Sequence, residues 1–85
     1  MPSKTVIVAS AVGLHARPAT LISQAAAAFD DDIELSVEGG DAVDAASTLM
    51  IMTLGAAKGT VVTVTSDNAD AVELIAGMIE TDLDA

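Results

Sequence analysis

The hydrophobic pattern changes its period between Gly13 and Pro18, and this change constrains the fold more than any other feature. Segment 5–10 (TVIVAS) is rich in β-branched residues and predicts a strand. After Pro18, apolar residues recur at helical spacing. A helix tolerates proline in its first turn, where the missing N–H has no intrahelical partner to lose. We therefore expect a helix that begins at about residues 15–17.

Further segments predict three more strands. Apolar and polar residues alternate over 33–38, which is typical of a half-buried strand, and a hairpin turn at 39–41 leads to a short strand over 42–45. Segment 60–66 (TVVTVTS) predicts the last strand. The first and the last predicted helix each present an apolar face. We expect these faces to consist of Ala19, Ile22, Ala26 and Phe29 in the first helix and Val72, Ile75, Ala76, Ile79 and Leu83 in the last.

Segment 48–54 is apolar enough to be a strand. Ser47 stands where a helix N-cap belongs and Gly55 where a C-cap glycine belongs, so the flanks favour a short helix. Asp67-Asn68 and Asp70 provide capping and a dipole complement for the last helix. The resulting order, strand–helix–strand–strand–helix–strand–helix, predicts an α+β fold: one domain over residues 1–85, with a mainly antiparallel sheet covered by helices on one face.

Composition excludes several functions. The 85 residues carry 13 acidic side chains against three of Lys and Arg, for a formal charge of −10. Nucleic-acid binding depends on a basic surface and is therefore not expected. The chain has no cysteine and one histidine, which argues against a zinc site and any disulfide. Without an evident signal peptide or an apolar run of membrane-spanning length, we expect a cytoplasmic protein that is not embedded in a membrane. The acidic, lysine-poor composition also resembles that of proteins from halophiles.

The period change coincides with the sole histidine and the sole arginine of the chain, in the stretch 13–20 (GLHARPAT). If the helix begins just after His15, the N–H groups of Ala16 and Arg17 have no intrahelical acceptor, and the positive end of the helix dipole lies beside the imidazole. Such a helix start binds anions, and the guanidinium of Arg17 suits phosphate oxygens. A neutral imidazole can attack phosphorus. No nucleotide-binding loop is present. The stretch therefore predicts a site, centred on His15, that accepts and passes on a phosphoryl group without any cofactor.

Two motifs resemble one known family. Residues 13–20 look like the active-site signature of HPr, the histidine-containing phosphocarrier of the sugar phosphotransferase system. Residues 46–59 (ASTLMIMTLGAAKG) are similar to the segment around that family's regulatory serine. The spacing of the two motifs and the chain length also match. The resemblance implies an open-faced β-sandwich with strand order 1-4-2-3 and three helices on one side.

The resemblance also implies a role for the chain as a relay protein, not an enzyme. His15 would take a phosphoryl group on Nδ1 from phosphorylated enzyme I, which phosphoenolpyruvate charges, and pass it to an enzyme IIA domain, possibly of the fructose type. Arg17 would stabilise that group, and Ser47 would match the serine that a kinase phosphorylates in some bacteria. For Ser47 the plain interpretation as an N-cap is favoured over regulation.

The chain departs from the family after Ser47, where a large apolar residue is usual and Thr48 stands instead. We expect Ala16, Thr20, Leu49 and Met52 to form an apolar docking surface, and Met50, Ile51 and Leu54 to face inward. We expect a monomer. Two alternatives stay open: a regulatory module that signals by its phosphorylation state, and a carrier that feeds dihydroxyacetone phosphorylation. A purely structural or ligand-sensing module would leave the pairing of His15 with Arg17 unexplained.

Overall fold

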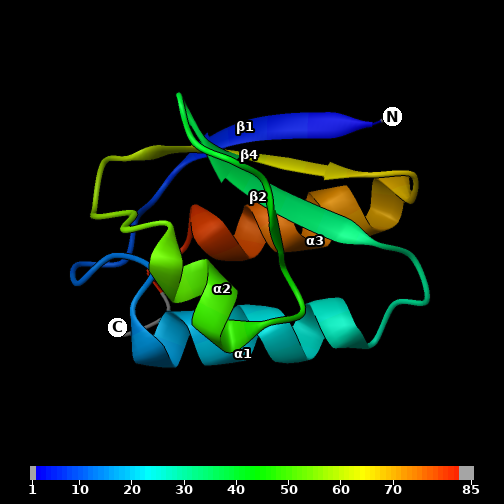
Figure 1. Cartoon of the computed structure of the whole chain (residues 1–85), viewed down its shortest axis with the longest axis horizontal. Coiled ribbons are helices and arrows are strands. Elements are labelled where there is room, and N and C mark those ends of the chain that lie inside the picture. Colours follow the sequence, from blue (N-terminus) through cyan, green and yellow to red (C-terminus); the bar gives the residue numbers. More distant parts are fainter. Residues whose placement is uncertain (1, 83–85) are drawn as a thin grey trace.

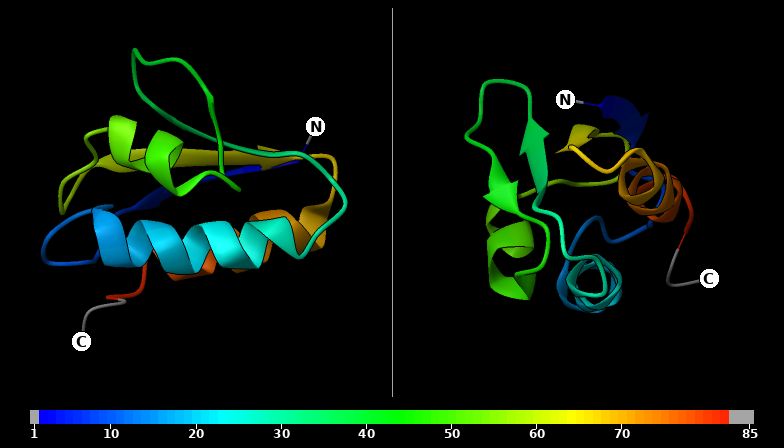
Figure 2. Two further views of the ribbon diagram at one scale, coloured as in Figure 1. Left: turned by 60° about the horizontal axis from the view of Figure 1, so that its bottom comes forward. Right: turned by 90° about the vertical axis from the view of Figure 1, so that its right-hand side faces the viewer.

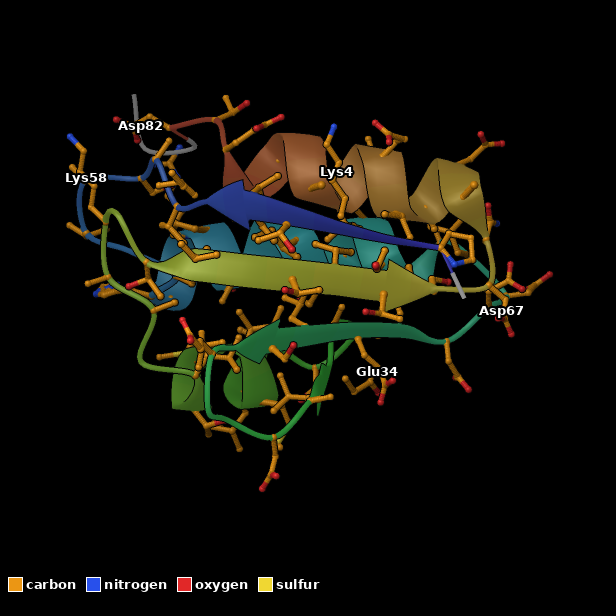
Figure 3. The ribbon with its side chains drawn as sticks, turned by 90° about the horizontal axis from the view of Figure 1, so that it is seen from above. Lys4, Glu34, Lys58, Asp67 and Asp82 are labelled. Atoms are coloured by element: carbon orange, nitrogen blue, oxygen red, sulfur yellow. The ribbon has the colours of Figure 1, made fainter. Side chains whose placement is uncertain are left out.

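A computed structural model describes residues 2–82, which form a four-stranded antiparallel sheet with three helices on one face (Figure 1). Viewed from above the sheet, the strands lie in front and the helices behind them (Figure 3). The predicted α+β class and the predicted order of elements are both confirmed. The elements are β1 (Ser3–Ile7), α1 (Ala16–Ala27), β2 (Ile33–Val37), β3 (Val43–Asp44), α2 (Thr48–Thr53), β4 (Val61–Ser66) and α3 (Ala69–Ile79).

The sheet has the strand order β1-β4-β2-β3, as the family resemblance implied. The last strand, β4, lies in the middle and pairs antiparallel with β1 on one side and with β2 on the other. The crossover from β1 to β2 runs through α1 and that from β3 to β4 runs through α2, so only β2 and β3 are neighbours in both sequence and space. Both crossover helices pack on one face of the sheet, and α3, which follows the last strand, packs on the same face (Figure 1).

Alternation along the strands builds the core. Val62 and Val64 of β4 and Leu35 of β2 are fully buried and face the helices, while the residues between them face outward. Against this layer pack Ile22 of α1 and Ile75 of α3, which are also fully buried. The predicted apolar faces of both helices are confirmed for all described members: Phe29 is half-buried against the core and the others are buried. Leu83 lies outside the described residues.

Each strand is shorter than predicted, and β1 and β3 end early because the chain leaves the sheet. Beyond Ile7, the N–H of Val8 still bonds to the carbonyl oxygen of Thr60 at 3.0 Å, but that of Ala9 turns to Ile79 of α3 at 3.2 Å. At the other edge, the Asp44 carboxylate accepts a hydrogen bond from the Ala46 N–H at 2.9 Å. That local turn ends β3 and directs the chain into α2.

The short segment after Ser47 is a helix, as its flanking residues indicated. Ile51 is fully buried and Leu54 packs against the core, but Met50 is 40% exposed, so its predicted inward orientation is wrong. Successive helix residues point about 100° apart. With Ile51 directed at the core, Met50 turns to the rim, where it lines a hollow with Val43 and Thr53.

No helix within residues 2–82 is long and apolar enough to cross a membrane.

Candidate functional site

His15 occupies the N-cap position of α1 and does not cap it. Its backbone is extended (φ −106°, ψ −168°), and its side chain makes no cap hydrogen bond. The first hydrogen bond of the helix runs from the Ala19 N–H to the His15 carbonyl oxygen at 2.9 Å. The N–H groups of Ala16 and Arg17 come before that bond, and Pro18 has none to offer. The exposed imidazole therefore stands at a helix start whose first two amides lie outside the helical ladder.

Pro18 is the third residue of α1, in the first turn, where its missing N–H interrupts no intrahelical hydrogen bond. Pro18 is fully buried, so the ring that fixes the backbone also anchors the first turn to the core. Ala16 and Arg17, one and two residues after His15, are exposed. No acidic residue lies in the first turn of α1, so no carboxylate of that turn competes for the positive end of the helix.

The loop that carries His15 is fixed against the loop that follows α2. Gly13 has a φ of +76°, and a Cβ there would clash with the backbone of Ala56 and Ala57. The adjacent Leu14 is buried and donates its N–H to the Ala56 carbonyl oxygen at 2.8 Å. The sequence pattern placed Gly13 only where the hydrophobic period changes. Its larger role, close approach to a segment more than 40 residues away, depends on tertiary contact.

His15 lines a shallow hollow of about 270 Å³ together with Val12 and Met52. Val12 is 58% exposed and Met52 is 40% exposed. Leu49, one turn before Met52 on α2, is 71% exposed. The structure thus leaves apolar side chains of α2 accessible at the histidine end of the molecule. Sequence reasoning missed Val12, whose signal would have been a β-branched residue standing in a loop.

The other predicted docking residues lie on α1. Thr20 is half-buried, and its hydroxyl donates to the Ala16 carbonyl oxygen at 2.7 Å. Ala16, Thr20, Leu49 and Met52 together are called the docking surface below. Its two halves come from different helices, which contact each other in the structure.

Ser47 is the N-cap of α2, as predicted. Its hydroxyl oxygen accepts a hydrogen bond from the Met50 N–H at 3.3 Å, and the residue is half-buried.

Acidic residues lie at both ends of the molecule: Asp82 is at the same end of the sheet as Lys58 in Figure 3, and a second group lies at the end away from His15. Helix α1 begins just after His15 and leads to a loop that contains Asp30–Asp32, and β4 ends beside that loop at Ser66, next to Asp67 (Figures 1 and 3). A hydrogen bond of 3.0 Å from the side-chain amide of Asn68 to the Asp31 carboxylate joins the two segments. Lys58 lies at the opposite end of the sheet from Asp67 in Figure 3. The length of α1 therefore separates His15 from Asp30–Asp32 and Asp67.

A metal centre has no ligand set in the described part of the chain: residues 2–82 contain no group of three or more His, Asp or Glu placed to hold an ion.

Comparison with known proteins gives one consistent result. The family model described as the PTS HPr component phosphorylation site matches residues 2–81. The structure is similar to a phosphocarrier protein HPr from Bacillus anthracis, with 36% identity over 92% of this chain and 95% of that one and a TM-score of 0.83. It is also similar to HPr from Thermoanaerobacter tengcongensis, with 32% identity, coverage of 94% and 92%, and a TM-score of 0.85. The catabolite repression protein Crh of Bacillus subtilis matches with 33% identity over 98% of each chain and a TM-score of 0.72.

Proposed function

Because this chain belongs to the HPr family of phosphotransferase-system phosphocarriers, we propose that His15 is the residue that carries the phosphoryl group. The observation that supports this assignment most strongly is the uncapped start of α1. An exposed imidazole stands there beside amides outside the helical ladder, in a first turn without acidic residues. These are the features that a transient phosphohistidine needs.

In the proposed step, a ring-nitrogen lone pair of His15 attacks phosphorus in the phosphorylated donor protein. The new nitrogen–phosphorus bond forms as the bond between phosphorus and the donor breaks, and no cofactor takes part. Nδ1 is the nitrogen that the family resemblance implies. The N–H groups of Ala16 and Arg17 then stabilise the phosphoryl oxygens, together with the guanidinium of Arg17. In the second transfer, a nucleophile of the acceptor protein attacks phosphorus, the nitrogen–phosphorus bond breaks, and the imidazole of His15 is regenerated.

We propose enzyme I as the donor and an enzyme IIA domain as the acceptor, each bound in turn by the docking surface. Exposed Leu49 and Met52 provide the apolar contact, and the hollow beside His15 admits the partner's reactive group. Apolar contact suits a chain of charge −10, which would repel an acidic partner at long range. Transfer is therefore expected to continue in molar salt, where charge steering is screened.

The test is phosphorylation by enzyme I and phosphoenolpyruvate. The wild-type chain should gain one phosphate that is labile in acid and stable in base, as expected for a phosphohistidine. His15→Ala should gain none and should remain folded, because the side chain of His15 makes no cap hydrogen bond. The matched control is Gln24→Ala, which truncates another exposed polar residue of α1 and should be labelled normally. Labelling of the His15→Ala variant would refute the assignment.

A further inference from the structure

Two hydroxyl groups meet between α1 and α2. The Oγ of Ser23, in a residue only 5% exposed, lies 2.6 Å from the Oγ1 of Thr48. The Ser23 hydroxyl also donates to the Thr20 carbonyl oxygen at 3.0 Å. Since a hydroxyl has one proton to donate, Thr48 must be the donor to Ser23. Both side chains are thus committed to one arrangement.

This contact lies at one end of α2, because Thr48 is its first residue. Beyond the other end, the Ala56 carbonyl oxygen accepts the Leu14 N–H at 2.8 Å. One bond joins α2 to the middle of α1, and the other joins the chain after α2 to the loop before α1. Leu49 and Met52 lie between these two attachments. The relative position of α1 and α2, seen side by side in Figure 2, is therefore fixed on both sides of the docking surface.

A hydrogen bond restricts the two helices in a way that apolar packing does not. Apolar contacts have no preferred direction, whereas a hydroxyl pair at 2.6 Å sets both a distance and an angle. The family resemblance predicts a large apolar residue at position 48. Here Thr48 is half-buried and bonded to α1 instead.

We propose that the Ser23–Thr48 hydrogen bond positions α2 against α1 and so holds the two halves of the docking surface in the geometry that the phosphoryl donor recognises. Ser23 and Thr48 are positioning residues, and neither is expected to touch the phosphoryl group. The inference rests on the proposed function, because it concerns how the donor protein is bound.

The test is the steady-state kinetics of phosphorylation of Ser23→Ala, Thr48→Val and Thr48→Ser by enzyme I and phosphoenolpyruvate. Displacing one half of a binding surface weakens binding more than chemistry, so Ser23→Ala and Thr48→Val should raise the KM for this chain about threefold to tenfold. Their kcat should change less than about twofold. Thr48→Ser keeps the hydroxyl and should restore the wild-type KM. Thr48→Val conserves shape and keeps the test available if Ser23→Ala fails to fold.

A matched control exists on the other face of the sheet, where the hydroxyls of Thr5 and Thr63 lie 3.1 Å apart. Thr63→Val also removes one hydroxyl of a pair, but far from the docking surface, and it should leave the KM unchanged. The proposal is overturned if Thr48→Val keeps the wild-type KM, or if Thr63→Val raises it as much. Failure of the proposed function gives a different result, since the wild-type chain itself would then not be phosphorylated.

Discussion

The first helix and the last helix begin in opposite ways. At the start of α3, the side-chain oxygen of Asn68 accepts the N–H groups of Asp70 and Ala71 at 3.0 and 3.3 Å, and Asp70 adds a carboxylate to the first turn. At the start of α1, His15 caps nothing and the first turn has no acid. The start of α3 is capped by a side chain, whereas the start of α1 has no side-chain cap from His15. We propose that this difference suits the start of α1, and not that of α3, to hold a phosphoryl group.

The largest expected effect comes from Gly13, which positions the uncapped start. Gly13→Ala should lower the free energy of unfolding by about 3–5 kcal/mol, because it combines a left-handed backbone with a clash against Ala56. The control is Gly39→Ala, which shares a positive φ (+78°) but has nothing within 4 Å, and should cost about 1–2 kcal/mol. Urea unfolding measures both. Equal losses would mean that the contact between Gly13 and Ala56 contributes nothing.

Removal of the Arg17 guanidinium at the start of α1 should affect phosphoryl transfer more than the stability of the fold. Arg17→Ala should slow phosphorylation of His15 about 10- to 100-fold, because a charge-assisted partner for the phosphoryl oxygens is lost. Arg17→Lys should be intermediate, since it keeps the charge but not the planar fork.

The matched control for Arg17→Ala is Lys58→Ala, which changes the net charge equally at another exposed position. It should transfer at the wild-type rate in a quenched-flow assay. A wild-type rate for Arg17→Ala would remove Arg17 from the site, and an equal slowing of both variants would show that only net charge matters.

Removal of the cap at the start of α3 should have a smaller effect, and it should affect stability and not phosphoryl transfer. Asn68→Ala should lower the free energy of unfolding by about 1 kcal/mol, because two amides of α3 lose their acceptor. Phosphorylation of His15 should not slow. Asn68→Ser supplies another cap acceptor and should recover most of the stability in thermal unfolding. The comparison between the two helix starts would fail if Asn68→Ala slowed transfer while leaving stability unchanged.

Much of this contrast was predictable from local sequence. Pro18 fixed the start of α1 to within a residue or two, and caps were predicted at Ser47 and at Asp67-Asn68 because capping depends on neighbouring residues only. The strand order came from the family resemblance, since hydrophobic alternation does not say which strands pair.

Tertiary contacts account for what the sequence did not predict. Ser23 and Thr48 are 25 residues apart, and nothing in either segment predicts that their hydroxyls meet. The approach of Gly13 to Ala56 has the same origin. Met50 was assigned to the wrong face because a helix of six residues is too short for its periodicity to choose the buried side.

The central claim is that the uncapped start of α1 holds the phosphoryl group, and amide chemical shifts test it most directly. Proton–nitrogen NMR spectra would be recorded before and after phosphorylation by enzyme I and phosphoenolpyruvate. The account predicts that the amides of Ala16 and Arg17 show the largest shifts, whereas those of Asp70 and Ala71, already bound by Asn68, stay in place. Shifts at Ala16 and Arg17 no larger than those at Asp70 and Ala71 would contradict it.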